Sequence, residues 1–188
     1  MKSENLEVLK NGGVGLVLTD TIFGLVGQAL KPDTVERLYR IKGRAEKKPF
    51  IILISDIKDL GLFNVEITES QRSKLDLWWP GPVSVILTTE MNKFNYLHRG
   101  NYTLSFRIPA KPELLDVIKE VGPLVAPSAN PQGFLPPQTI IDARRYFGNS
   151  VDFYEETSDV PSLDPSTLVK LSGDGSYEVL RSGGNFKL

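Results

Sequence analysis

The stretch from Leu16 to Ile54 decides how the rest of the chain is interpreted, and it reads LVLTDTIFGLVGQALKPDTVERLYRIKGRAEKKPFIILI. It predicts, in order, a buried strand, a polar turn, a second apolar run, a capped helix, a cationic loop and another buried strand. Cationic side chains are concentrated at the end of the helix and just after it, at Arg40, Lys42, Arg44, Lys47 and Lys48. Charge concentrated beside two apolar segments indicates that an anionic group lies nearby.

The helix in this stretch is predicted from its ends. Asp33 followed by Glu36 has the spacing of a capping box, and Pro32 stands just before it. Gly43 is expected to end the helix.

Two explanations of the cations stay open. Lys42 and Arg44 fall at a helix C-terminus, where the macrodipole favours positive charge by about 0.3–1 kcal/mol each. That influence fades within one turn, so it does not explain Lys47 and Lys48. A phosphate-bearing ligand would explain all four.

Composition narrows the class of protein. The chain has 188 residues, a net charge of −1, no cysteine and one histidine, His98, in a polar loop. This length fits one domain spanning 1–188, and the charge argues against a generally basic nucleic-acid coat. Missing cysteines exclude disulfides, a thiolate nucleophile and Cys-based zinc sites, and a single histidine excludes two-histidine metal motifs. Without a membrane-length apolar run or a signal-peptide core, we expect a cytoplasmic protein that does not enter a membrane.

The remaining elements alternate between helix and strand. We expect helices at 3–11, after Thr68 with its capping partner Gln71, at 112–122, and from Thr139 to 148. Strands are expected at 14–18, 50–54, 83–89, 102–108, 124–126, 151–154, 166–171 and 177–181, with a turn-rich loop at 155–165. The consecutive pairs 83–89/102–108 and 166–171/177–181 imply antiparallel members. The fold class is therefore α/β, with an open, twisted, mixed parallel and antiparallel sheet flanked by helices.

Polar residues follow several of the predicted strands. They occur at 19–21, 128–130 and 166–167. In open α/β sheets ligands bind at the rim where strands end, so we expect these segments to gather there.

Neither common nucleotide-binding motif is present. The chain has no G-x-x-x-x-G-K-[ST] and no G-x-G-x-x-G after a strand, so side-chain cations and loop amides would have to hold a phosphate. Candidates for that role are Lys42, Arg44, Ser128, Asn130 and Arg181. Taken singly, Ser128 and Asn130 beside prolines are ordinary turn residues, and Arg181 is an ordinary strand arginine.

Seven ordered blocks carry a family resemblance that covers nearly the whole chain. They are TDTIFGL at 19–25, KGRAEKKPF at 42–50, WPGPVSVIL at 79–87, LSFRIP at 104–109, APSANPQG at 126–133, STLV at 166–169 and LRSGG at 180–184. Together they resemble the YrdC/Sua5 family, the threonylcarbamoyl-AMP synthases, in its short form without the C-terminal extension.

The resemblance implies an enzyme with a concave basic cavity. Such an enzyme joins L-threonine, bicarbonate or CO2, and ATP into L-threonylcarbamoyl-adenylate and pyrophosphate, as the first stage of the t6A modification of tRNA. The family's ATP positions fall on Lys42, Arg44, Lys48, Thr103, Ser128, Asn130, Pro136 and Arg181, with Lys42 and Arg44 as the catalytic pair. Its threonine positions fall on Thr19, Arg107, Ala126 and Ser166.

This sequence departs from the family pattern in three places. Leu18 stands where a proline is usual, and Phe23 where a tyrosine is usual. The segment 155–165 replaces an acidic, glycine-containing stretch. The first two changes keep apolar character and bear on the geometry of the turn, whereas the third bears on a lid over the site.

The implied mechanism needs positioning and charge neutralisation more than covalent chemistry. No residue is placed to act as a covalent nucleophile. Lys42, Arg44 and Arg181, with Mg²⁺ brought by ATP and no protein metal site, would neutralise the triphosphate. Arg107 would clamp threonine's carboxylate, a task that suits a planar guanidinium better than an ammonium.

Two rival functions stay open. A non-catalytic protein could use the same basic cavity to bind double-stranded RNA or tRNA, which requires cations but no threonine pocket. A paralogue could instead form a different carbamoyl-adenylate from carbamoyl phosphate. For the enzyme, the expected partners are ATP, L-threonine, bicarbonate, possible tRNA or double-stranded RNA, and later-stage t6A modification proteins.

Overall fold

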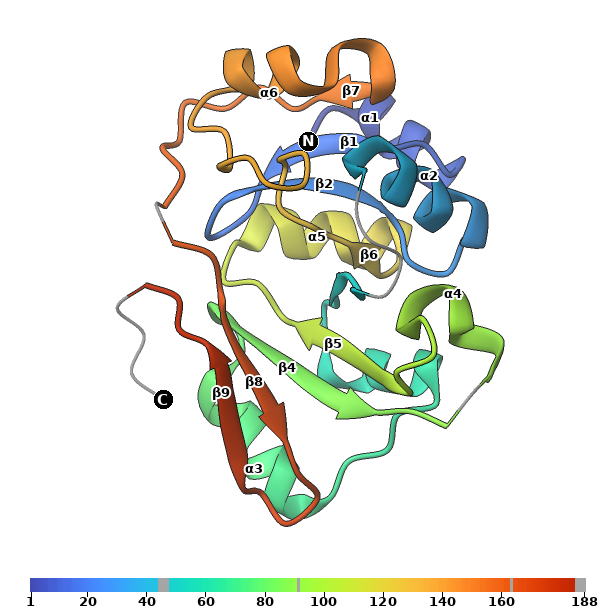
Figure 1. The fold of residues 1–188 in the computed structure, drawn as a ribbon, viewed down its shortest axis with the longest axis vertical. Coiled ribbons are helices and arrows are strands. Elements are labelled where there is room, and N and C mark those ends of the chain that lie inside the picture. The colour runs from blue at the N-terminus through green and yellow to red at the C-terminus, as the bar shows by residue number, and fades with distance from the viewer. Residues whose placement is uncertain (44–47, 91, 163, 185–188) are drawn as a thin grey trace.

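The strands build one mixed sheet. The structure, a computed structural model, describes residues 1–43, 48–90, 92–162 and 164–184, and its strands follow the order β7-β1-β2-β6-β3-β5-β4-β8-β9 (Figure 1). They are β1 (Gly15–Leu18), β2 (Phe23–Gln28), β3 (Ile51–Leu53), β4 (Val83–Thr88), β5 (Thr103–Arg107), β6 (Leu124–Val125), β7 (Phe153–Tyr154), β8 (Thr167–Leu171) and β9 (Tyr177–Arg181). The pairs β1–β7, β3–β5 and β4–β8 are parallel, and the remaining neighbours are antiparallel. The α/β class and the mixed sheet are confirmed.

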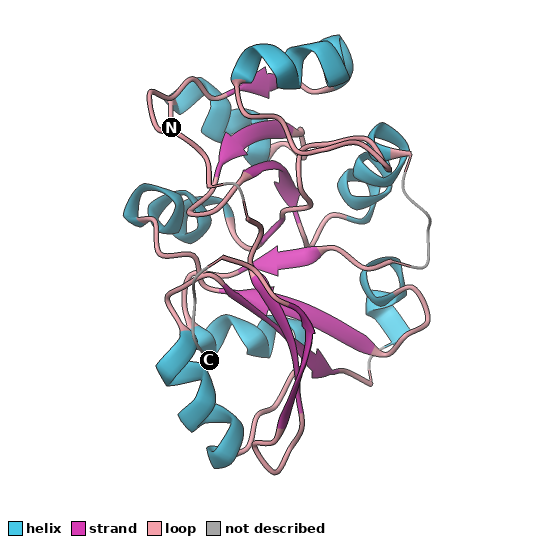
Figure 2. Ribbon diagram, turned by 60° about the vertical axis from the view of Figure 1, so that its left-hand side comes forward, coloured by secondary structure: helices cyan, strands magenta, loops and turns pink. Residues whose placement is uncertain are grey.

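Helices lie on both sides of the strands, as Figure 2 shows. They are α1 (Ser3–Lys10), α2 (Pro32–Lys42), α3 (Glu69–Trp78), α4 (Asn95–His98), α5 (Pro112–Val121) and α6 (Ile140–Phe147), with short 3-10 helices η1 (Ile57–Phe63), η2 (Asn92–Phe94) and η3 (Gly148–Ser150). None of these described helices is both long enough and apolar enough to cross a membrane.

Two hydrophobic clusters hold the helices to the sheet. One joins α1 and α5 to the strands through Leu9, Val117 and Val26. The larger one includes Leu38 of α2 and Leu75 of α3. The continuous apolar run at 14–18 led us to expect a strand covered on both faces. The observed strand there, β1, is buried along its whole length.

The helix caps were predicted with mixed success. Thr68 and Gln71 form the expected capping box at α3, with Thr68 Oγ1 accepting from Gln71 N at 3.1 Å. At α2 the predicted Asp33 cap is wrong, because Pro32 is itself the first helical residue and no side chain caps the helix. Proline has the φ required at that position, so the helix starts earlier and Asp33 falls inside its first turn. For the helix expected at 3–11, Ser3 was the predicted cap, but Ser3 lies inside α1 and does not cap it.

His98 was predicted to lie in a polar loop, but the segment between β4 and β5 contains η2 and α4. His98 is only 1% exposed; its Nδ1 accepts a hydrogen bond from Gly100 N at 3.1 Å and its ring stacks on Tyr102. A buried histidine stacked in this way has a structural role.

One ion pair fastens the edge strand β7. Arg37 of α2 donates to both carboxylate oxygens of Asp152, at 2.6 and 2.9 Å, and Asp152 Oδ2 also accepts from Val14 N at 2.7 Å. The hydrogen bond from Arg37 lowers the pKa of Asp152 below its ordinary value of 3.8. This link joins α2, β7 and the start of β1.

The pairing makes part of the protein's stability dependent on pH. A carboxyl group with a lowered folded-state pKa stabilises the fold above its unfolded pKa, and the effect is lost as the pH falls through the folded value. We therefore expect Asp152→Asn to lower the Tm at pH 7, with a difference from wild type that shrinks below pH 3.8. Thermal melts of both proteins between pH 2 and pH 7 test this prediction. A difference in Tm that stays the same at every pH would show that the charge of Asp152 does not cause the difference.

Candidate functional site

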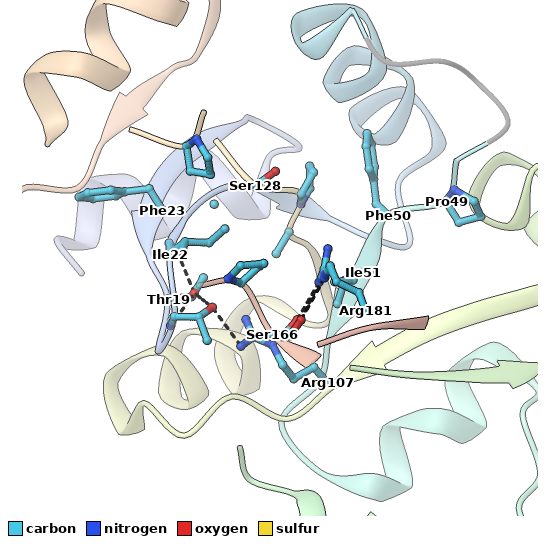
Figure 3. Close-up of a pocket in the computed structure, with 16 residues that line it drawn as sticks. Thr19, Ile22, Phe23, Pro49, Phe50, Ile51, Arg107, Ser128, Ser166 and Arg181 are labelled. Atoms are coloured by element: carbon cyan, nitrogen blue, oxygen red, sulfur yellow. Dashed lines mark hydrogen bonds between the residues drawn. The ribbon is translucent and has the colours of Figure 1, made fainter. Parts of the chain in front are cut away.

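A cavity of about 160 Å³ lies where several strands end, and it is called the central cavity here. Its walls come from segments far apart in the sequence, as Figure 3 shows. The lining residues are Thr19, Thr21, Ile22, Phe23, Gly24, Pro49, Phe50, Ile51, Arg107, Ala126, Pro127, Ser128, Pro136, Pro165, Ser166 and Arg181. The expectation that the polar segments at 19–21, 128–130 and 166–167 meet at one rim is confirmed for Thr19, Ser128 and Ser166.

Two further hollows share walls with the central cavity. The strand-face hollow, of about 280 Å³, is lined by Lys48, Pro49, Ile51, Ile86, Asn101, Thr103, Leu104, Ser105, Leu168 and Arg181. The basic hollow, of about 190 Å³, is lined by Lys42, Lys48, Ser128, Asn130, Gln132 and Gly133. Every site residue predicted within the described ranges lines one of these three spaces. Arg44 and Lys47 lie outside the described residues.

The polar turn after β1 is held together by its own hydroxyl groups. Thr19 Oγ1 donates to Ile22 O at 2.8 Å, accepts from Thr21 N at 3.2 Å and lies 3.1 Å from Thr21 Oγ1 (Figure 3). The hydroxyl of Thr19 is therefore used inside the turn. This leaves its methyl group as the part that can face a ligand.

Arg107, at the end of β5, is the buried cation of the central cavity and is 4% exposed. Its Nη1 lies 2.9 Å from Asp20 Oδ1, in an ion pair without hydrogen-bond alignment, and donates to Thr21 Oγ1 at 3.3 Å. Burial lowers the pKa of Arg107, while the negative charge of Asp20 opposes that effect. The Nε of Arg107 is buried without a hydrogen-bond partner in the described structure, so one donor of this guanidinium is not yet used.

Asp20 lies in the polar segment 19–21 that was expected at the rim, but its pairing with Arg107 was not predicted. Its Oδ2 accepts from Ala110 N at 2.9 Å, which fixes the carboxylate beside the guanidinium. The available signal was an acidic residue in the polar turn directly after a buried strand. Only the fold shows that this turn meets the end of β5.

Lys42 lies at the end of α2, and its ammonium points into the chain segment after β6. It donates to the main-chain oxygens of Ser128 and Asn130, the latter at 2.7 Å, and lies 3.4 Å from Asn130 Oδ1. The side-chain amide of Asn130 in turn donates to Phe134 O. Lys42 is 3% exposed and lines the basic hollow, to which it contributes a positive charge. Its hydrogen bonds also hold the shape of the segment after β6. Direct contact with a phosphate stays a prediction for it.

Arg181 reaches the cavity because β9 is irregular. Val179 pairs with Val169 and Arg181 with Leu168, so Leu180 is an extra residue on β9 and forms a bulge. Regular alternation would place Arg181 on the same face as Val179, and the bulge turns it to the other face. There it donates to Ser166 O, at 3.2 Å from Nε and 2.8 Å from Nη2 (Figure 3).

The chain that follows the cationic loop is held by aromatic stacking. The rings of Tyr39 and Phe50 lie 4.0 Å apart at 20°, and Tyr39 OH donates to Lys48 O at 3.0 Å. Phe50 lines the central cavity, and Lys48 lines the other two hollows. Packing of α2 therefore positions the residues at which all three spaces meet.

The comparison with known protein families agrees with this geometry. A family model described as "Telomere recombination", that of the Sua5/YciO/YrdC domain, matches residues 7–183. The chain belongs to the Sua5/YciO/YrdC family. The resemblance expected from the seven sequence blocks is confirmed.

Curated members of the Sua5/YciO/YrdC family include proteins similar to most of this chain. A threonylcarbamoyl-AMP synthase of Nitrosococcus oceani is 36% identical over 148 residues, covering 78% of this chain and 80% of that protein. A putative threonylcarbamoyl-AMP synthase of Mycobacterium tuberculosis is 27% identical over 175 residues, covering 93% of this chain and 80% of that protein.

Solved structures of the Sua5/YciO/YrdC family share the fold. Sua5 of P. abyssi, complexed with L-threonine, superposes with a TM-score of 0.88 at 26% identity, over 96% of this chain. The chain spans about half of that structure, 53% of its length. E. coli YciO has a TM-score of 0.83 at 20% identity, covering 96% of this chain and 87% of that one, which shows the fold alone.

Two of the three departures from the Sua5/YciO/YrdC pattern reach the central cavity, through Phe23 and Pro165, and the third, Leu18, directly precedes Thr19 of its wall. Leu18 and Phe23 are buried, and Phe23 lines the cavity. The segment after β7 leads from the top of the molecule in Figure 1 down to the start of β8, and Pro165 and Ser166 at its end line the cavity. It is held by Ser162 N, which donates to Thr21 O at 2.7 Å, and by an ion pair of 2.9 Å between Asp159 and Lys111.

Proposed function

We propose that this protein forms L-threonylcarbamoyl-adenylate and pyrophosphate from L-threonine, bicarbonate or CO2, and ATP, in the first stage of tRNA t6A modification. The observation that carries the proposal is the shared walls of the three hollows. The four residues of the expected threonine set, Thr19, Arg107, Ala126 and Ser166, line the central cavity. Within the described residues, the expected ATP set lines the two neighbouring hollows, except for Pro136, which lines the central cavity itself. The names of the curated relatives and the threonine complex of Sua5 support the same reaction.

Threonine would be held by the buried end of β5. Its carboxylate would meet the guanidinium of Arg107, whose Nε has no hydrogen-bond partner in the described structure. Asp20 keeps that guanidinium oriented. A bidentate contact between guanidinium and carboxylate would fix the direction of the amine, which is the group that must react.

The reaction itself has two bond-forming steps. The neutral amine of threonine adds to the carbon of CO2, forming a C–N bond and releasing one proton, to give the carbamate. A carbamate oxygen then attacks the α-phosphorus of ATP, and the bond to the β-phosphate oxygen breaks as pyrophosphate leaves. Arg181 lines both the central cavity and the strand-face hollow, and Ser128 lines both the central cavity and the basic hollow. The α-phosphate would lie between these two residues.

Charge neutralisation would come from several sources. Lys42, Lys48 and Arg181 surround the proposed phosphate path, and Arg44 is expected to join them. In the described parts of the chain no group of three or more His, Asp or Glu side chains could hold a metal ion. Mg²⁺ would therefore arrive bound to the phosphates of ATP, where it neutralises charge on the leaving pyrophosphate.

The cavity must also exclude water, because a carbamate decomposes readily in water. Pro165 and Ser166, at the end of the segment between β7 and β8, form part of the wall. The bond from Ser162 N to Thr21 O ties that segment to the turn after β1. This wall would shield the intermediate.

The assay that tests the proposal is a dependence experiment. Purified protein with ATP and Mg²⁺ is expected to release pyrophosphate only when both L-threonine and bicarbonate are present. Mass spectrometry should then detect a product in which threonine, one carbon dioxide and AMP are joined. Pyrophosphate release that ignores threonine, or the absence of that product, would contradict the proposal.

Both rival functions give different results in the same assay. A protein that only bound RNA would show salt-sensitive binding and no threonine-dependent turnover. Recognition of an RNA backbone calls for exposed cations such as Lys48, and Arg107, buried against Asp20, is out of reach of such a backbone. A paralogue acting on carbamoyl phosphate would turn over when that compound replaces threonine and bicarbonate. Contacts with tRNA and with later-stage modification proteins stay predictions.

A further inference from the structure

Gly24 lies on β2 between two residues whose main-chain groups are hydrogen-bonded to the segment after β6. Leu25 N donates to Pro127 O at 2.9 Å, and Ala129 N donates to Phe23 O at 2.8 Å. Gly24 itself forms an isolated bridge with Ser128. The residue is buried and lines the central cavity, so its backbone forms part of the wall.

No contact within the described residues requires a glycine at this position. A Cβ atom built on Gly24 would lie 3.5 Å from both Thr19 Cγ2 and Pro127 O and 3.9 Å from Ala126 Cβ, all ordinary contacts. The φ angle of Gly24 does not lie in the left-handed region. Gly27 on the same strand is different, because its Cβ would come within 2.5 Å of Thr34 Cγ2. Packing therefore explains Gly27 and leaves Gly24 unexplained.

A glycine inside a strand weakens it, and often marks a place where a ligand approaches closely. The space left open at Gly24 faces two methyl groups, Thr19 Cγ2 and Ala126 Cβ, and one main-chain oxygen, Pro127 O, which already accepts a hydrogen bond from Leu25 N. The hydroxyl of Thr19 is bound to Ile22 O at 2.8 Å inside its own turn. The side-chain groups around this space are therefore apolar.

We propose that Gly24 determines amino-acid specificity by leaving room for the β-methyl group of L-threonine. This inference rests on the proposed function, since it concerns the same threonine subsite. An apolar space beside Thr19 and Ala126 suits a methyl group and gives a hydroxyl no partner among those side chains. Serine lacks that methyl group, so it would leave the space empty.

The test compares L-threonine with L-serine in the wild type and in Gly24→Ala. The added methyl group would fill the space and exclude the threonine methyl, while serine would still fit. We expect kcat/KM for threonine to fall relative to serine by tenfold or more, within the range of about 10–200-fold that one methylene contributes in a pocket. Because the built Cβ makes only ordinary contacts, the Tm of Gly24→Ala should stay near that of the wild type.

Two further variants sharpen the result. Ala126→Gly removes the opposite methyl group, so the double variant Gly24→Ala/Ala126→Gly is expected to recover part of the preference for threonine. Gly27→Ala adds a methyl group to the same strand outside the cavity, and is expected to lower the Tm without changing the ratio between the two amino acids.

A folded, active Gly24→Ala variant with the wild-type threonine-to-serine ratio would overturn the inference while leaving the proposed function intact. Should Gly24→Ala fail to fold, Ala126→Gly decides alone. It enlarges the same space and is expected to weaken the preference for threonine over serine, and an unchanged ratio overturns the inference. A wild-type protein whose turnover needs no amino acid would overturn the proposed function and this inference with it.

Discussion

Replacing Arg107 with methionine is expected to abolish threonine-dependent pyrophosphate release and to lower the free energy of unfolding by about 3–5 kcal/mol, the usual effect of removing one partner of a buried ion pair. Asp20 would be left as a buried carboxylate facing an apolar side chain, and the site would lose its contact for the substrate carboxylate. Chemical denaturation measures the loss of stability, and the pyrophosphate assay measures the loss of activity.

A double variant separates the two roles of Arg107. Asp20→Asn combined with Arg107→Met removes both charges, so it should recover much of the lost stability without recovering activity. Arg107→Lys keeps a positive charge near Asp20 but lacks the planar fork, so it should raise the KM for threonine more than it lowers the Tm. A threonine KM that stays at the wild-type value in Arg107→Lys would argue against carboxylate binding by this residue.

Lys42→Met is expected to reduce stability and ATP-dependent turnover together. The change removes the hydrogen bonds from the ammonium to the main-chain oxygens of Ser128 and Asn130. A hydrogen bond to a charged group contributes about 1.5–3 kcal/mol to stability, so the loss should be visible in a thermal melt. Hydrogen exchange of residues 126–134 should speed up, because Asn130 also holds Phe134 O.

Lys48→Met is the matched comparison for this prediction. Lys48 lines the same basic hollow but is exposed, so removing its charge should weaken ATP binding with little change in Tm. A Lys42→Met variant that melts like the wild type and loses only ATP affinity would show that Lys42 acts as a phosphate ligand and does not shape the segment after β6.

Local patterns in the sequence were sufficient for most of the elements. The apolar run of β1, the Thr68 capping box and the glycine that ends α2 each depend on neighbouring residues, so they could be recognised without the fold. The errors have local causes too. At Pro32 the fixed φ of proline moved the helix start ahead of the predicted cap.

The site was predicted less completely, because its geometry depends on contacts between distant segments. Ordered motifs placed Thr19, Ser128 and Ser166 in one site, and the structure brings them to one cavity. No pattern in the sequence paired Asp20 with Arg107. Their ion pair forms only because the turn after β1 meets the end of β5.

The sequence by itself determined the α/β class, most strands and helices, the family and the polar segments that end at one rim, since hydrophobic period, caps and motifs are written in consecutive residues. The tertiary structure alone decided which charges meet and which way side chains point. It buried Arg107 against Asp20, turned Lys42 toward main-chain oxygens and used the bulge at Leu180 to face Arg181 into the cavity. These outcomes depend on strand register and on burial, where an unpaired charge is strongly unfavourable, and neither is encoded in any short stretch of the chain.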